Sequence, residues 1–227
     1  MSATMIDLPA TCERALLERF LRAEAMALWA VRAAQTQQLP RHVQTFLQRH
    51  ETDEQDHLRQ FEGMLGTLSQ RPATLPTVPS QWEMLAVLLF GYEALGLEFA
   101  TLLAAIRPDL SDILEDEQAH VGFFEKELKA ILAGGAVGAQ QAREAARTWW
   151  KKLPRTVDRY LQDPSLEPYR SDLRRHILGV IGQRFINLGL LADATLPTAR
   201  CRSSLRGQAG SAQRPSKTVE SRRSRST

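Results

Sequence analysis

Two Glu-x-x-His motifs contain the residues of this chain whose types and spacing could bind metal ions. Glu54 and His57 form the first motif, and Glu117 and His120 form the second. Because residues three apart lie on one face of an α-helix, each motif would project a carboxylate and an imidazole together. Mixed carboxylate and imidazole ligands suit iron or manganese. A single motif of this kind can occur by chance in any charged helix, so the hypothesis depends on where the helices place the two motifs.

Both motifs lie on helix faces that are otherwise apolar. Apolar residues recur at helical spacing through most of residues 11–194, which predicts an all-α fold. Proline breaks divide the first part of this segment into four long helices, expected at about 11–38, 42–68, 80–107 and 110–133. In the second and fourth helices the acidic residue and the histidine occupy the seam that should face the core.

The first helix supplies a further glutamate level with the first motif. Glu24 lies on the apolar seam of that helix, and the midpoint between Glu24 and Glu54 is residue 39, at the turn between the two helices. Residues equidistant from a tight turn lie level on antiparallel helices. Glu24 is therefore expected beside Glu54 and His57.

The third helix offers two glutamates, Glu93 and Glu98, for the same role beside the second motif. The midpoint between Glu98 and Glu117 is 107.5, at the turn before Pro108, whereas the midpoint between Glu93 and Glu117 is residue 105, inside the helix. Turn geometry thus favours Glu98. Helical phase does not decide between the two, because both lie off the centre of the apolar stripe, so Glu93 stays open as the alternative.

The charge of these side chains points to bound cations. Ionised carboxylates buried without a partner cost several kcal/mol each. The four expected seams carry no inward Lys or Arg that could neutralise them. Four glutamates carry a charge of −4 and two neutral histidines carry none, so two divalent ions would balance the cluster. The sequence therefore predicts a two-metal site inside the four helices.

This pattern resembles the ferritin-like di-iron carboxylate superfamily, in which two helices each supply one Glu and two others each supply Glu-x-x-His. The resemblance covers about residues 11–133. It implies a ferritin-like four-helix bundle that holds two iron ions, with manganese possible, and carboxylates that bridge them. The implied ligands are Glu24, Glu54, His57, Glu98, Glu117 and His120, with Glu93 as the alternative to Glu98.

The resemblance leaves several functions open. We expect a di-iron oxidoreductase, an O₂-dependent hydroxylase or oxidase of a small organic substrate. A hydroxylase would need an external electron donor, because the chain has no flavin or nicotinamide fingerprint. The alternatives are a ferritin-like protein that stores iron or removes peroxide, and a metal-free helical interaction module. Further helices after the fourth favour the oxidase or hydroxylase, since they look like a cover or a docking surface.

Two neighbours of the expected site have simpler interpretations. His50 lies one turn before Glu54 on the same seam and could support the site, but a core histidine satisfied by hydrogen bonds is the favoured interpretation over a ligand. Tyr92 could gate the site, whereas most tyrosines in such positions belong to the core.

The remainder of the chain is expected to form appendages. Residues 1–10 would be an N-terminal extension, and residues 134–196 a helical addition packed on the bundle, with helices at about 140–152 and 169–194. Residues 197–227 contain eight Lys or Arg against one Glu, and almost no large apolar residues, so a disordered basic tail is expected. Such a tail could touch nucleic acid, but its charge alone specifies no partner.

Composition favours a cytoplasmic protein, which could form a homo-oligomer. The two cysteines, Cys12 and Cys201, are far apart and offer neither a disulfide framework nor a Cys-rich metal site. The N-terminus lacks the pattern of a signal peptide. The longest apolar run, Met84–Phe90, is shorter than the roughly 20 residues of a membrane span, so no transmembrane segment is expected.

Overall fold

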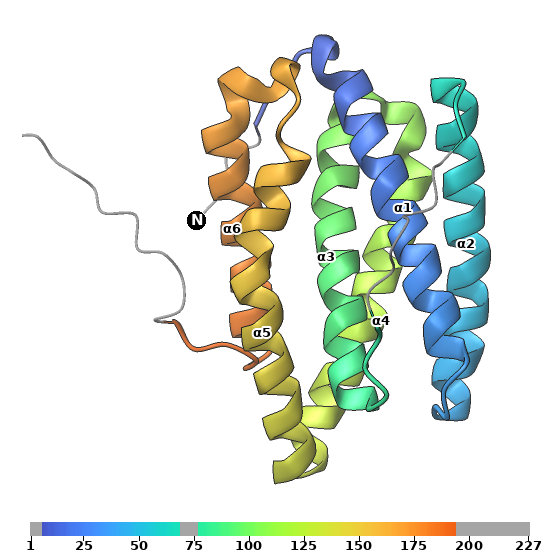
Figure 1. Cartoon of the computed structure of the whole chain (residues 1–227), viewed down its shortest axis with the longest axis vertical. Coiled ribbons are helices and arrows are strands. Elements are labelled where there is room, and N and C mark those ends of the chain that lie inside the picture. The colour runs from blue at the N-terminus through green and yellow to red at the C-terminus, as the bar shows by residue number, and fades with distance from the viewer. Residues whose placement is uncertain (1–5, 69–76, 194–227) are drawn as a thin grey trace, which may run out of the picture. The chain divides into compact units, whose positions relative to one another are not determined.

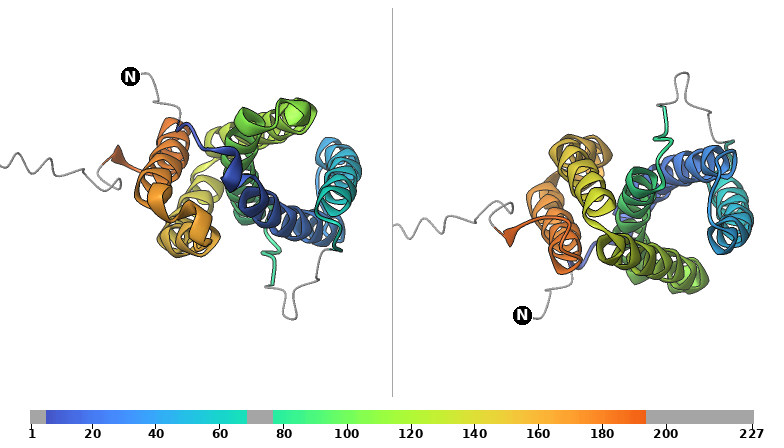
Figure 2. Two further views of the ribbon diagram at one scale, coloured as in Figure 1. Left: turned by 90° about the horizontal axis from the view of Figure 1, so that it is seen from above. Right: turned by 90° about the horizontal axis from the view of Figure 1, so that it is seen from below.

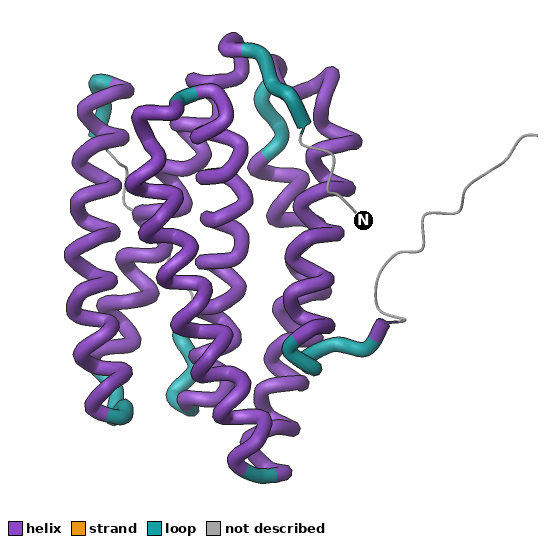
Figure 3. Tube along the Cα trace, turned by 180° about the vertical axis from the view of Figure 1, so that it is seen from behind, coloured by secondary structure: helices purple, strands orange, loops and turns teal. Residues whose placement is uncertain are grey.

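The computed structural model describes residues 6–68 and 77–193 of the chain. Its regular elements in these residues are all helical (Figure 3), which confirms the expected all-α class. The expected tail at 197–227, including Cys201, lies outside the described residues, as does half of the expected N-terminal extension. Six α-helices follow one another in the described chain: α1 (Glu13–Gln35), α2 (Arg41–Leu65), α3 (Trp82–Ile106), α4 (Ser111–Gly134), α5 (Ala136–Tyr160) and α6 (Arg170–Asn187).

Helices α1 to α4 lie side by side, and α5 and α6 flank them (Figure 1). α1 packs on α2 and on α3, and α3 packs on α4. Seen along their axes, α1 to α4 surround one interior, while α5 lies against α3 and α4 (Figure 2). Short turns join α1 to α2 and α3 to α4, so the helices of each pair run antiparallel.

The sequence of each helix explains how much of it is buried. α2 buries a single stripe at helical spacing, which contains His50, Glu54 and His57 among apolar residues. α3 is buried on nearly every side and is long and apolar enough by composition to span a membrane. Its burial inside the protein is that of a core helix, and no other helix in the described residues passes the same test of length and composition.

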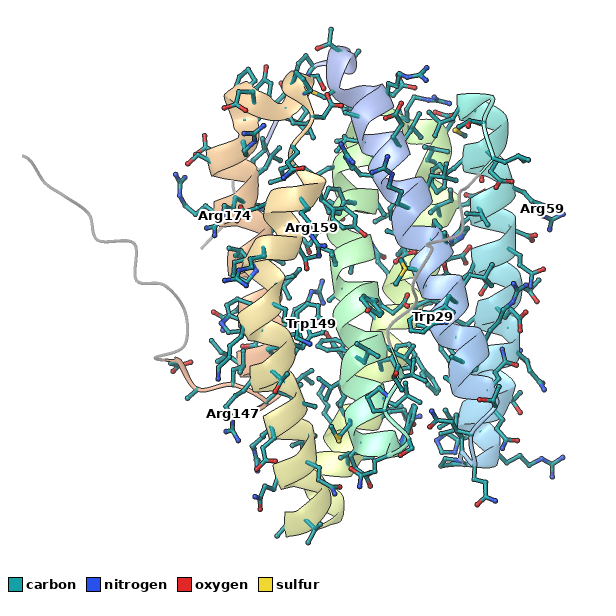
Figure 4. The ribbon with its side chains drawn as sticks, in the orientation of Figure 1. Trp29, Arg59, Arg147, Trp149, Arg159 and Arg174 are labelled. Carbon is teal, nitrogen blue, oxygen red and sulfur yellow. The ribbon has the colours of Figure 1, made fainter. Side chains whose placement is uncertain are left out.

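A glycine in α3 lets α5 approach closely. A Cβ atom on Gly91 would lie only 2.3 Å from the indole of Trp149, so a larger residue has no room there. Trp149 lies between α5 and α3 (Figure 4) and stacks on Phe185 of α6, with ring centroids 5.1 Å apart. Phe185 in turn contacts Phe90 of α3. This aromatic cluster fixes the last two helices on the first four.

α5 is longer than the sequence predicts. The expected helix ended near residue 152, two residues before Pro154, which lacks a backbone N–H and whose ring crowds the preceding turn. The structure continues the helix through Pro154 to Tyr160. Buried Trp150, Leu153 and Val157 keep the apolar stripe at spacings of three and four residues, and this packing offsets the proline.

Candidate metal centre

Seven buried carboxylates and imidazoles from four helices meet in the interior of α1 to α4. They fall into two groups, and the ligand atoms of each group all lie within 4.8 Å of one another, close enough to hold a metal ion. Glu54 belongs to both groups. The first group contains Glu24, Glu54, His57 and Glu117, and the second contains His50, Glu54, Glu93 and His120.

One nitrogen of each imidazole points at the carboxylates. Nδ1 of His57 lies 3.5 Å from Oε2 of Glu24 and 3.9 Å from Oε1 of Glu117. Nδ1 of His120 lies 3.5 Å from Oε2 of Glu93 and 3.7 Å from an oxygen of Glu54. In both histidines the nitrogen that faces the carboxylates is therefore Nδ1.

Two aspartates outside the cluster fix the tautomer of these histidines. Nε2 of His57 lies 3.1 Å from Oδ2 of Asp116, and Nε2 of His120 lies 3.1 Å from Oδ2 of Asp53. A carboxylate accepts hydrogen bonds, so a ring proton is held on Nε2, and Nδ1 is the nitrogen left for a cation to bind. The hydrogen bond to His120 is also the main reason that the pKa of Asp53 is lowered.

The aspartates follow a pattern that sequence analysis missed. Each one directly precedes the glutamate of a Glu-x-x-His motif, but it bonds the histidine of the other motif. The repeated Asp-Glu-x-x-His string was the available signal. Its crossed pairing between α2 and α4 could be found only once those helices were placed side by side.

Several atoms of the cluster have no hydrogen-bond partner in the described structure. These buried atoms are Oε2 of Glu24, Glu54 and Glu117, Oε1 of Glu93, and Nδ1 of His50, His57 and His120. A buried polar atom without a partner costs about 1–3 kcal/mol, and more if it is charged. Converging lone pairs of carboxylates and imidazoles are the donor set that a divalent cation would satisfy. The residues present therefore fit a metal-binding site.

Without a cation, protons must neutralise the cluster. Burial raises the pKa values of Glu24, Glu54 and Glu117 well above the usual range for a carboxyl. Burial also acts to raise the pKa of Glu93, but the positive charges of His50 and His120 outweigh it and lower this pKa to about 2. The environment thus disfavours four free carboxylates and favours any cation that can compensate them.

Glu93, rather than Glu98, is the glutamate of α3 that reaches the cluster, which corrects the preference from turn geometry. Gly96 marks the face of α3 that looks at the site, because a Cβ atom there would lie 2.7 Å from Oε2 of Glu117. Glu93 precedes Gly96 by three residues and shares its face, whereas Glu98 follows by two and lies about 200° around the helix. Glu98 instead faces α6, with Oε2 3.4 Å from Nε2 of His176.

His50 is a third imidazole of the cluster. Its Nε2 lies 2.9 Å from Oε1 of Glu54 and 3.3 Å from Oε2 of Glu93, and its side chain is fully buried. Sequence analysis favoured a core histidine satisfied by hydrogen bonds. The hydrogen bond to Glu54 is present, but the same nitrogen also belongs to the second group of potential ligands. In the sequence, its position four residues before Glu54 on the same buried seam was the signal that His50 could join the cluster.

A small chamber adjoins the carboxylates on the side of α1, α3 and α5. Its volume is about 20 Å³, and its walls include Glu24, Glu93 and Glu117. That is room for about one water-sized molecule. Tyr92 of α3 and Tyr160 of α5 also line it, so the last part of α5, beyond Pro154, contributes to the surroundings of the site. Burial is the largest cause that raises the pKa of Tyr160 to about 12.

No protein-family model, curated protein or solved structure matches this chain. Two buried groups of glutamates and histidines, joined through Glu54, could hold metal ions.

Proposed function

We propose that this chain is a ferritin-like di-iron carboxylate protein that acts as an O₂-dependent oxidoreductase, an oxidase or hydroxylase of a small organic substrate. One observation carries the proposal: four glutamates and three histidines lie buried together, with lone pairs that have no partner in the described structure. A cluster of this kind is costly in a folded protein unless it binds cations.

The residues divide naturally between two ions. One ion would be held by Glu24, His57 and Glu117, the other by His50, Glu93 and His120, with Glu54 shared. Four carboxylates balance two divalent ions. The mixture of oxygen and imidazole donors suits iron or manganese better than the sulfur-rich sets that select copper(I) or zinc.

Bound iron would supply one-electron redox chemistry and a position for dioxygen. The part of the protein in this proposal is to hold the donors and exclude bulk water. The crossed aspartate bonds orient His57 and His120, and the chamber beside Glu24 and Glu117 admits only a very small molecule. Dioxygen has that size, whereas an organic substrate would require the chamber walls at Tyr92 and Tyr160 to move.

The size of this chamber also favours a second candidate function. A ferritin-like protein that oxidises stored iron or removes peroxide needs access only for a small oxidant. For the hydroxylase, an external electron donor and a cytoplasmic location remain part of the proposal. Both candidates require bound metal, which separates them from a metal-free helical module.

The decisive experiment counts metal and then adds oxygen. Purified chain is reconstituted with Fe²⁺ without oxygen, its metal content is measured by elemental analysis, and oxygen uptake is followed with an electrode and by near-ultraviolet absorption. We expect two iron ions per chain and rapid oxygen uptake. The matched variants are Glu54→Ala, which removes the shared carboxylate, and Glu98→Gln, which leaves the cluster intact.

Each possible result has a distinct meaning. Well under one iron per chain in the unmodified protein would overturn the metal site. Two irons per chain without oxygen uptake would retain the site and refute the oxidoreductase. If the chain takes up oxygen and mass measurement in solution shows a large protein shell filled with iron, storage would be favoured over the hydroxylase.

A further inference from the structure

A second and larger cavity lies on the opposite side of α3 from the metal centre. Its volume is about 350 Å³, within the range of pockets that hold small organic ligands. α3, α4 and α6 contribute its walls, together with Ile6 near the N-terminus. Glu98 lines this cavity and Gly96 faces the metal centre, so the body of α3 separates the two sites.

The lining of the cavity combines an apolar part with a few polar groups. Leu97, Leu102 and Val180 contribute apolar surface, and Glu98, His176 and Arg184 contribute polar groups. Pockets for small organic molecules usually show this combination, in which apolar walls give affinity and a few polar atoms fix the orientation.

Arg184 lines the cavity and has a buried hydrogen-bond donor without a partner in the described structure. Its Nη1 donates to Oε1 of Glu125 at 3.1 Å, whereas its Nε is buried without a hydrogen-bond partner in the described structure. A guanidinium presents its N–H groups in a planar fork that matches the two oxygens of a carboxylate.

Glu98 can serve as a second donor beside this guanidinium. Only 5% of Glu98 is exposed, and burial raises its pKa to about 7 in spite of the nearby charge of Arg184. Below that pH its carboxyl group is mainly protonated and can donate an O–H to an anion. His176 stands 3.4 Å from the same side chain and supplies a further polar contact.

We propose that this cavity binds a small monocarboxylate with an apolar chain, its carboxylate at Arg184 and Glu98 and its chain against Leu97, Leu102 and Val180. An amine is disfavoured because it would meet the guanidinium. An alcohol would lack the negative charge that pairs with it. The site is independent of the proposed metal centre, because it shares no side chain with either group of potential ligands.

Octanoate is a suitable probe for this site. Isothermal titration calorimetry at about pH 6, below the pKa of Glu98, would compare octanoate, octylamine and octan-1-ol on the full chain. We expect saturable binding of octanoate with one molecule per chain, binding of the alcohol weaker by about tenfold or more, and no binding of the amine. Equal binding of all three, binding of the amine alone, or no binding of octanoate would overturn the proposal.

Variants assign the binding to this cavity. Arg184→Gln should weaken octanoate binding by about tenfold or more, whereas Arg174→Gln on the same helix, which pairs with Asp158, should leave it unchanged. If Arg184→Gln does not fold, Val180→Phe tests the site by filling it while every charge stays in place. Unchanged octanoate affinity in Val180→Phe would refute the assignment. Iron content unchanged in these variants would show that the result does not depend on the metal centre.

Discussion

Asp53 of α2 lies 3.1 Å from Nε2 of His120 of α4, and it is the residue directly before Glu54. Asp116 of α4 stands in the same relation to His57 of α2. Each helix thus provides a glutamate to the interior and an aspartate to the histidine of its neighbour. The two Glu-x-x-His helices are therefore connected by hydrogen bonds, and both also direct ligand atoms into the space between them.

Removing the charge of an orienting aspartate should weaken metal binding while the fold persists. Asp53→Asn leaves Nε2 of His120 with a neutral partner that can be an acceptor or a donor, so the tautomer with Nδ1 free is no longer enforced. Loss of such an outer contact typically costs about 10–100-fold in metal affinity. Competition with a chelator of known affinity would measure the change for Fe²⁺ or Mn²⁺. The control is Asp56→Asn, an exposed residue of the same helix that pairs with Arg59, and equal loss in both variants would contradict the orienting role.

His50 should matter for one of two bound metals. If its Nε2 is a ligand, His50→Ala removes one donor from the group with Glu93 and His120 and none from the group with His57. We expect the metal content to fall from two ions per chain towards one at limiting metal, and the remaining ion to keep its affinity. His42→Ala is the control, because this exposed histidine of the same helix pairs with Glu127. Two ions bound with unchanged affinity in His50→Ala would restore the interpretation as a core histidine.

Adding metal should stabilise the folded chain. An ion that binds the native state and not the unfolded state raises stability by RT ln(1 + [L]/Kd), which is about 2.7 kcal/mol at a hundredfold excess over Kd. Thermal unfolding followed by circular dichroism with Fe²⁺ or Mn²⁺, and again after a chelator, would show a reversible rise in Tm. Glu117→Ala removes a buried carboxylate from the cluster and should abolish most of the rise. A rise of the same size in Glu117→Ala would exclude that residue from the site.

The sequence predicted the helices and most of the cluster because both depend on local spacing. The helical spacing of apolar residues and the proline breaks located the first four helices. The predicted buried seam of the second helix contained His50, Glu54 and His57, and the structure buries all three in α2. The choice between Glu93 and Glu98 depended on rotation of α3, which its uniform apolar surface does not reveal. The contacts of Glu93 with His50 and His120, and the close approach of Gly96 to Glu117, show which face of α3 looks inward.

Contacts between residues far apart in the sequence explain the greater length of α5 and the aspartate–histidine pairs. α5 continues past Pro154 because its apolar stripe is buried against α3. The local sequence pattern does not predict this contact. Tyr160 consequently reaches the chamber beside Glu24. The pairing of Asp53 with His120 has a sequence signal only in retrospect, since the two residues are 67 positions apart.

Gly96→Ala should separate metal binding from folding. The added Cβ would lie 2.7 Å from Oε2 of Glu117, which is the far end of a flexible side chain and can move aside. The chain should therefore fold, with a displaced Glu117 and weaker metal binding. The matched control is Gly63→Ala in α2, where a Cβ meets nothing within 4 Å and helix propensity favours alanine by about 1 kcal/mol. Metal affinity unchanged in Gly96→Ala would show that the position of Glu117 is not critical.

Glu98 should make stability fall as pH rises through neutrality. Its pKa is about 7 in the folded chain against 4.5 for an ordinary glutamate, mainly because of burial. Between these values the folded state holds a proton that the unfolded state has released, so the free energy of unfolding decreases with pH in that window and levels off above it. Glu98→Gln removes this dependence. It should match the unmodified protein near pH 4.5 and exceed it by about 2–3 kcal/mol at about pH 8.

Urea denaturation of the metal-free chain at several pH values would measure this difference. His176 and Arg184 face Glu98 and are present in both proteins, so the titration of His176 largely cancels in the comparison. Glu115→Gln, the same substitution at an exposed position of α4, is the control. If Glu98→Gln differs from the unmodified protein by the same amount at pH 4.5 and pH 8, Glu98 does not titrate in this window. The burial of its carboxyl would then carry no free-energy cost on ionisation.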